Sequence, residues 1–111
     1  LKKICEKEKI YLMEDNCESL GAKLNGKNTG TFGILNTNSF FFSHHINTIE
    51  GGMICIPKNS ALDSEKIRAI CNQGQVGRYN HEYIGFNFRL AEPLCLMAYG
   101  QMKLHMFFQI V

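Results

Sequence analysis

Asp15 and His44 are the two residues of this chain whose types and positions are best suited to chemistry. Asp15 ends the run IYLMED, which reads as a short apolar strand closed by acids. A carboxylate at the carboxyl end of such a strand lies where α/β sheets bind ligands, and it can pair with a protonated pyridine nitrogen. His44, in the segment SFFFSHHINTIEGG, carries an imidazole that can transfer protons near neutral pH.

Each of these residues also has a simpler interpretation. Asp15 and Glu18 have the spacing of a capping box, in which the acid would begin a helix. His44 and His45 could be surface polar residues. They are unfavoured as metal ligands, because adjacent residues of an extended chain point to opposite faces and no further residue at a suitable spacing completes a zinc site. Ser39 could be an ordinary strand hydroxyl that bonds to the backbone.

Three motifs, EDNCESLGA, SFFFSHHINTIEGG and YIGFNFR, resemble segments of the DegT/DnrJ/StrS family of nucleotide-sugar aminotransferases, which depend on pyridoxal phosphate. The resemblance implies that Asp15 binds the ring nitrogen of the cofactor and that Ser39 binds its phosphate. It also implies that Asn87 reaches the cofactor phosphate of the neighbouring subunit in a homodimer. Glu18 is expected at the cofactor too, where many aminotransferases of the family have glutamine. Arg89 suits a structural ion pair as well as a substrate contact.

His44 stands where most members of the family have the lysine that holds the cofactor. An imidazole cannot form an imine with an aldehyde, so such a site must bind its cofactor noncovalently, most simply as pyridoxamine phosphate. A histidine here, within HHI and followed by EGG, resembles the 3-dehydratase branch, which removes the C3 hydroxyl of nucleotide-linked 4-keto-6-deoxyhexoses. The resemblance implies C3 dehydration with His44 as the base. Sugar transamination and a non-catalytic remnant of such an enzyme are the alternatives.

Apolar periodicity and turn residues predict an α/β arrangement in which helices and strands alternate. Helices are expected at residues 1–8, 61–72 and 91–108, and strands at 10–15, 38–42 and 51–57. The glycine-rich stretches NGKNTGTFG and QGQVGRYN are expected to be loops. Asn59 or Ser60 is expected to cap the middle helix, and Gly51 and Gly52 to permit a tight turn.

The resemblance implies a larger setting for these elements. Residues 1–111 are expected to be part of the large domain of an aspartate-aminotransferase-like enzyme, the fold type I class of pyridoxal phosphate enzymes. The phosphate-binding loop of that domain and the C-terminal small domain are expected to lie outside this chain.

Composition narrows the remaining classes of protein. With 111 residues and 45% hydrophobic content, the chain can bury one modest core. Acids and bases alternate closely and the net charge is +2, which leaves no basic stripe for nucleic acid. No apolar run is long enough to cross a bilayer and no signal peptide is apparent, so a cytoplasmic protein is expected. The five dispersed cysteines predict reduced, mostly buried thiols.

Overall fold

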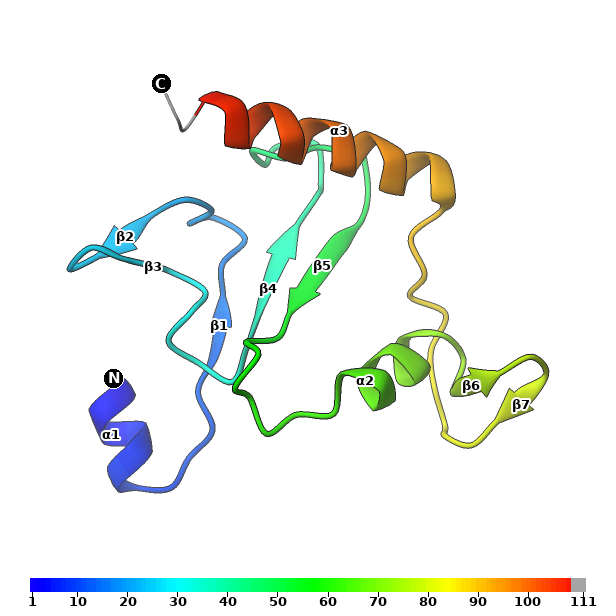
Figure 1. Ribbon diagram of the computed structural model, residues 1–111, viewed down its shortest axis with the longest axis horizontal. Coiled ribbons are helices and arrows are strands. Elements are labelled where there is room, and N and C mark those ends of the chain that lie inside the picture. Colours follow the sequence, from blue (N-terminus) through cyan, green and yellow to red (C-terminus); the bar gives the residue numbers. More distant parts are fainter. Residues whose placement is uncertain (109–111) are drawn as a thin grey trace.

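A three-stranded sheet carries the segments that hold Asp15 and Ser39 in the computed structural model of the chain (Figure 1). The structure describes residues 1–108, and of residues 105–108 it describes the backbone alone. Strand β1 (Met13–Asp15) pairs in parallel with β4 (Leu35–Ser39), and β4 pairs antiparallel with β5 (Gly52–Cys55). Because β1 and β4 are parallel, their carboxyl ends lie at the same edge of the sheet, with Asp15 beside Thr37.

The position of β4 corrects the prediction of a strand at 38–42. The strand ends at Ser39, and the aromatic residues that follow it belong to the loop between β4 and β5. Phe40 is buried in the small hydrophobic core. The rings of Phe41 and Phe42 are exposed and pack against each other, with their centroids 4.4 Å apart. The β propensity of the aromatic run does not extend the strand, because Phe40 packs in the core and Phe41 and Phe42 pack against each other in the loop.

Buried asparagines, instead of apolar side chains, lie on one face of β4 and at the residue that follows β1. The Asn16 amide donates to Asn38 at 3.0 Å, and the Asn38 amide donates to Asn36 at 2.7 Å. Asn36 in turn donates to the carbonyl of Gly30 at 2.5 Å, while the Ser19 hydroxyl donates to Asn16 at 2.6 Å. Since buried polar groups are costly unless they are satisfied, this chain of bonds fixes the register of the two strands and the loops beside them.

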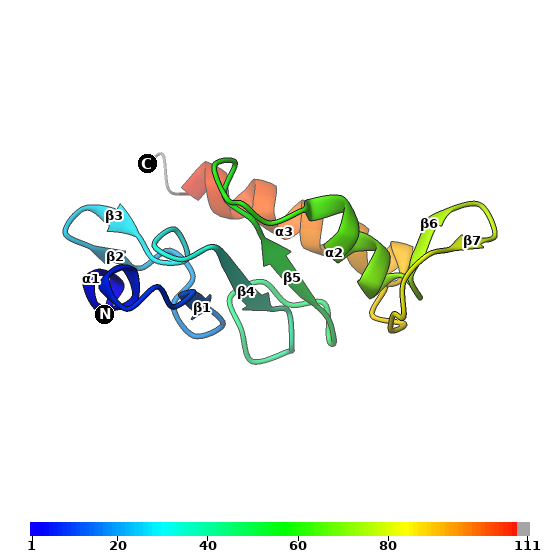
Figure 2. The same cartoon turned by 90° about the horizontal axis from the view of Figure 1, so that it is seen from below.

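The helices within residues 1–108 are α1 (Lys2–Lys7), α2 (Ser64–Cys71) and α3 (Glu92–Phe108). Figures 1 and 2 show α3 lying across the end of the sheet where β4 finishes and β5 begins. There Ala98 of α3 packs with Phe40 and Ile46 of the loop that joins the two strands. Pro93 lies in the first turn of α3, as predicted, where its missing N–H is tolerated.

The start of α2 differs from the prediction. Asp63, and neither Asn59 nor Ser60, is the N-cap, because its carboxylate accepts hydrogen bonds from the backbone N–H groups of Glu65 and Lys66. The Ser60 hydroxyl instead donates to the carbonyl of Ile34 at 2.8 Å, and this bond holds the segment between β5 and α2 against the start of β4. The helix is therefore shorter than predicted.

Two short hairpins lie in the stretches that were predicted to be irregular. Strands β2 (Lys23–Leu24) and β3 (Lys27–Asn28) pair across Asn25 and Gly26, whose φ angles are 51° and 77°. Positive φ at both central residues is the signature of a type I′ turn, for which Asn-Gly is the preferred pair. The second hairpin joins β6 (Gln75–Gly77) to β7 (Asn80–His81).

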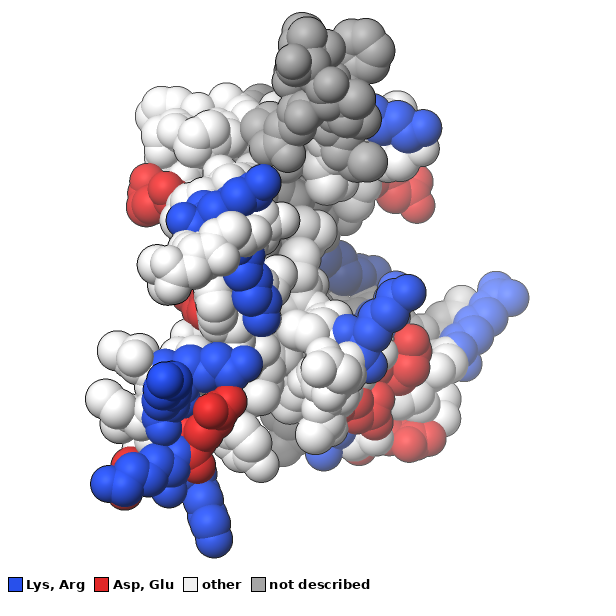
Figure 3. All heavy atoms as spheres, turned by 60° about the vertical axis from the view of Figure 1, so that its left-hand side comes forward, with Lys and Arg blue, Asp and Glu red and all other residues white. Residues whose placement is uncertain are grey.

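Opposite charges are mixed on the surface. Figure 3 shows basic and acidic side chains beside one another on the face drawn, and Lys2–Glu6 and Lys7–Glu8 form exposed ion pairs of 3.7 and 3.5 Å. The cysteines are free thiols, but four are half-buried and Cys95 is exposed, so the prediction that most are buried is wrong. Within residues 1–108 no helix is long and apolar enough to cross a bilayer.

Candidate active site

Asp15 presents its carboxylate at the carboxyl edge of β1. The carboxylate accepts a hydrogen bond from the backbone N–H of Cys17 at 3.1 Å, and it is exposed to solvent. Hydrogen bonds from the Cys17 thiol and N–H, with a smaller electrostatic contribution from His44, lower the pKa of Asp15 below its ordinary value. The residues after Asp15 form turns rather than a helix, so the capping-box interpretation is wrong. An ionised carboxylate is the partner that a protonated ring nitrogen requires.

His44 lies in the loop after β4 and turns its imidazole toward the same edge. Its backbone N–H donates to the carbonyl of Phe41 at 3.0 Å, which forms a turn directly after the strand. The imidazole is largely covered, with 11% of the side chain exposed, and its Nδ1 lies 3.7 Å from a carboxylate oxygen of Glu18. His45, by contrast, is exposed. The structure therefore brings His44, Glu18 and Asp15 together.

The loop that carries His44 is held by its neighbours. Asn47 donates its backbone N–H to the Gln101 side chain of α3 at 2.8 Å, and the Gln101 amide donates back to the Asn47 carbonyl. The fully buried Thr48 donates to the carbonyl of Glu50 at 2.6 Å. Gly51 has φ 131°, and a Cβ there would lie 2.6 Å from a methyl of Leu90. The prediction that this glycine is structurally required is confirmed.

Ser39 closes β4 at this edge. Its hydroxyl oxygen accepts a hydrogen bond from the backbone N–H of Phe41 at 3.2 Å, as the simpler interpretation of this residue expects. A hydroxyl that accepts a hydrogen bond still has its own proton to donate. The local bond therefore orients Ser39 without using the donor that a phosphate oxygen would need.

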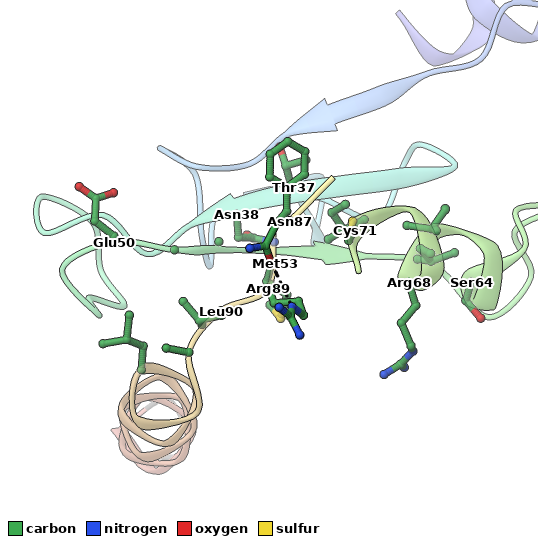
Figure 4. Close-up of a pocket in the computed structure, with 18 residues that line it drawn as sticks. Thr37, Asn38, Glu50, Met53, Ser64, Arg68, Cys71, Asn87, Arg89 and Leu90 are labelled. Carbon is green, nitrogen blue, oxygen red and sulfur yellow. Dashed lines mark hydrogen bonds between the residues drawn. The ribbon is translucent and has the colours of Figure 1, made fainter. Parts of the chain in front are cut away.

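Asn87 lies on a different element from the other predicted residues. It faces an open groove of about 1170 Å³ that runs along β5 between α2 and the start of α3 (Figure 4). Arg89 donates from Nε to the amide oxygen of Asn87 at 3.1 Å, and it forms no ion pair with the acidic side chains that the structure describes. Among the described residues, no hydrogen bond joins Asn87 to Asp15, Ser39 or His44.

The structure adds Glu14, which the sequence did not identify. Its carboxylate accepts three backbone hydrogen bonds, from Gly30 at 2.8 Å, Phe32 at 2.6 Å and Gly33 at 2.7 Å. These bonds fasten the glycine-rich loop to β1, directly beside Asp15. Glu14 and Asn16 are two residues apart, as are Asn36 and Asn38, and this period of two is the signal that could have revealed a polar face.

The chemistry of this edge fits a pyridoxal-type cofactor. The ionised carboxylate of Asp15 suits a pyridinium nitrogen, and the Ser39 hydroxyl has a free proton for a phosphate oxygen. The covered imidazole of His44 suits a proton transfer. Among the residues whose side chains are described, no three acids, cysteines or histidines gather as a metal site.

Known proteins resemble this chain in sequence. The DegT/DnrJ/EryC1/StrS aminotransferase family matches residues 1–109. The GDP-4-keto-6-deoxy-D-mannose 3-dehydratase of Yersinia pseudotuberculosis is 60% identical over 52 residues, which are 47% of this chain and 13% of that enzyme.

Two solved structures share the fold of almost the whole chain. PseC of Helicobacter pylori, an aminotransferase involved in pseudaminic acid biosynthesis, has a TM-score of 0.83 at 28% identity, over 96% of this chain and 29% of PseC. The Escherichia coli GDP-4-keto-6-deoxy-D-mannose-3-dehydratase, solved with hydrated pyridoxal phosphate, has a TM-score of 0.70 at 32% identity, over 92% of this chain and 31% of the enzyme. The chain spans less than a third of each relative.

The fold and the site define a part of the large domain of a fold type I pyridoxal phosphate enzyme. The chain belongs to the DegT/DnrJ/EryC1/StrS aminotransferase family. The predicted family and the predicted α/β fold class are both confirmed. The family includes aminotransferases and sugar 3-dehydratases, and its members depend on pyridoxal phosphate.

Proposed function

We propose that this chain carries the cofactor-facing edge of an enzyme that uses pyridoxamine phosphate to remove the C3 hydroxyl of a nucleotide-linked 4-keto-sugar. The observation that carries the proposal is the position of His44 at the edge where Asp15 lies. The loop from Phe40 to Gly52 contains no lysine, so it offers no amine to hold the cofactor aldehyde. The similarity to two GDP-4-keto-6-deoxymannose 3-dehydratases supports a GDP-linked substrate.

Each residue at this edge has a separate part in the proposed reaction. When bound, pyridoxamine phosphate supplies a primary amine for the sugar ketone and a ring that withdraws electrons. Asp15 keeps the ring nitrogen protonated, and Ser39 donates its hydroxyl proton to the phosphate. With the sugar bound at the cofactor amine, His44 would take a proton from the benzylic carbon of the cofactor onto an imidazole nitrogen. It would then give that proton to the C3 oxygen, which leaves as water as its bond to C3 breaks. Asn87 donates its amide to the phosphate bound by the neighbouring subunit of a homodimer.

Sugar transamination is the second candidate, and the similarity to PseC favours it. Both reactions use the same cofactor and the same kind of ketone. They differ in the group that transfers the proton, which is a lysine amine in transamination and His44 in the proposed dehydration. The lysine amine can also bind the cofactor between turnovers. Position 44 therefore distinguishes the two candidates. A non-catalytic relative would retain the fold and lack both activities.

The products distinguish these candidates. The full-length protein that contains this chain is incubated with pyridoxamine phosphate, glutamate as amine donor, and GDP-4-keto-6-deoxymannose. Mass spectrometry and NMR then identify the sugar. A 3-deoxy sugar is expected, whereas a 4-amino sugar that retains its C3 oxygen would contradict the proposal, and so would unchanged substrate.

A pair of variants assigns the reaction to His44. His44→Asn is expected to lower kcat by about a hundredfold or more, because a general base contributes that much. The exposed neighbour provides the control, and His45→Asn should retain kcat within about threefold. Equal loss in both variants would show a structural effect on the loop.

A further inference from the structure

The carboxylate of Glu18 approaches the imidazole ring of His44. Its carboxylate oxygen lies 3.7 Å from Nδ1 of His44, and the two side chains differ sharply in exposure, at 90% and 11%. The distance exceeds a normal hydrogen bond but falls within ion-pair range, so a small rotation of the exposed glutamate completes the bond. The contact involves one specific nitrogen of the ring.

The backbone around Glu18 is fixed although its carboxylate is exposed. On one side, Asn16 is buried and bonded to Asn38 at 3.0 Å. On the other side, Ser19 donates both its N–H and its hydroxyl to Asn16, at 3.1 and 2.6 Å. Leu20 then packs against the hydrophobic core. Glu18 is thus presented from a rigid turn, and only its side-chain rotation remains free.

Resting on the proposed function, we infer that Glu18 is a positioning residue that keeps the proton of neutral His44 on Nδ1, so that Nε2 is the nitrogen that exchanges protons with the substrate. The hydrogen bond made by one ring nitrogen fixes the tautomer, and thereby the nitrogen left free to act as a base. A carboxylate bonded to Nδ1 also stabilises the imidazolium that forms once Nε2 has taken a proton, as it does in serine proteases.

The other charged and titratable groups near His44 do not substitute for Glu18. Asp15 interacts electrostatically with His44, but its hydrogen bonds go to Cys17. The Cys17 thiol is itself engaged with Asp15, which raises the pKa of Cys17 above its ordinary value. Glu18 is the group for which the structure gives a direct approach to the ring. A glutamine at this position could accept a hydrogen bond from Nδ1–H but could not offset the positive charge of the imidazolium.

The first test reads the tautomer without any turnover. The full-length protein, with and without pyridoxamine phosphate, is labelled with ¹⁵N-histidine, and the ring signals of His44 are assigned by their loss in His44→Asn. The expected spectrum at alkaline pH shows the proton on Nδ1. Glu18→Ala is expected to move the proton mainly to Nε2, the tautomer that free histidine favours in water. A proton on Nε2 in the unmodified protein would overturn the inference.

A matched carboxylate serves as the control. Glu65 of α2 is also exposed, at 81%, and approaches Arg68 at 3.8 Å, so Glu65→Ala removes a comparable ion pair away from the site. This variant should leave the His44 spectrum unchanged. If Glu65→Ala shifts the tautomer as much as Glu18→Ala, the effect is not specific to Glu18 and the inference fails.

The second test uses the kinetics of the proposed dehydration. Glu18→Ala is expected to lower kcat by about tenfold or more and to leave KM almost unchanged, because the base would be misoriented while the binding groups stay in place. Glu18→Gln should recover part of the loss, since it retains an acceptor without the charge. An unchanged kcat in Glu18→Ala would overturn the inference, and so would a loss that appears in KM alone. The NMR experiment measures the tautomer of His44 without substrate. Its result therefore tests the role of Glu18 separately from the reaction that the enzyme performs.

Discussion

The carboxylate of Asp15 is exposed, yet its environment keeps it ionised. The thiol and N–H of Cys17 bond to it, and these bonds lower its pKa below the ordinary value of an aspartate. A group with a lowered pKa remains charged through the neutral range and gains a proton only in strong acid. The negative charge proposed to hold the cofactor ring nitrogen is therefore present at neutral pH.

Replacement of Asp15 by asparagine separates this charge from the local fold. The amide oxygen of Asn can still accept the hydrogen bond from Cys17 N–H, so the turn after β1 should form and Tm should change little. The charge is lost, and we expect kcat of the full-length enzyme to fall on the order of a hundredfold. Steady-state kinetics and a thermal melt measure the two effects. Turnover equal to that of the unmodified protein would exclude Asp15 from the site.

Most elements could be predicted from the sequence where the pattern is local. The terminal helix begins within one residue of its predicted start, because Pro93 marks its first turn. The strand ending at Asp15 was also anticipated, although it is exposed on one face. Asp15 and His44 were identified by their motifs, but their proximity to Glu18 was not, since contacts between distant segments depend on the fold.

Other elements escaped prediction because long-range polar contacts decide them. β4 contains Asn36 and Asn38, which have low strand propensity, and their buried hydrogen bonds compensate for it. Glu14 was read only as part of an acidic strand end, yet it binds three N–H groups of a loop that follows later in the sequence. The partners of these bonds are 16 to 19 residues apart, so a pattern of neighbouring residues does not reveal them.

The junction between α2 and the second hairpin depends on Gly74. This residue has φ 78°, its N–H donates to the carbonyl of Ala69 at 2.7 Å, and a Cβ would collide with the carbonyl oxygen of Tyr83. Gly74→Ala should therefore lower the free energy of unfolding of the full-length protein by about 2–4 kcal/mol, through overpacking and backbone strain. Denaturant titration measures the change.

Gly26 provides a control with nearly the same backbone conformation. Its φ is 77°, and no atom lies within 4 Å of the position that a Cβ would occupy. Gly26→Ala should carry only the conformational cost, about 1–2 kcal/mol. Equal effects of the two substitutions would show that Tyr83 does not approach Gly74 closely.

The molecule as a whole is thin and exposes much apolar surface. Its extents are 46 × 39 × 22 Å, and the buried hydrophobic side chains among the described residues are Phe40, Ile46, Ala69 and Ala98. Large apolar side chains on several elements are open to solvent, including Ile84 at 97% and Leu96 at 70%. Such surface is typical of a protein that buries it against further structure.

Residues 1–111 produced alone should therefore be poorly stable or self-associating. Few apolar side chains are buried to offset the conformational entropy lost on folding, and the exposed faces favour association. Size-exclusion chromatography with light scattering and a thermal melt measure both properties. A monomer with a sharp, cooperative unfolding transition would contradict this prediction.

The proposed dehydration requires that His44 occupies the position of the cofactor-binding lysine, as the resemblance to the family implies. Borohydride reduction of the full-length protein with pyridoxal phosphate, followed by mass spectrometry and peptide mapping, tests that claim directly. We predict reversible cofactor binding without a phosphopyridoxyl adduct, and an adduct at position 44 in His44→Lys. Efficient formation of an adduct at another active-site lysine of the unmodified protein would show that a lysine, and not His44, serves the cofactor.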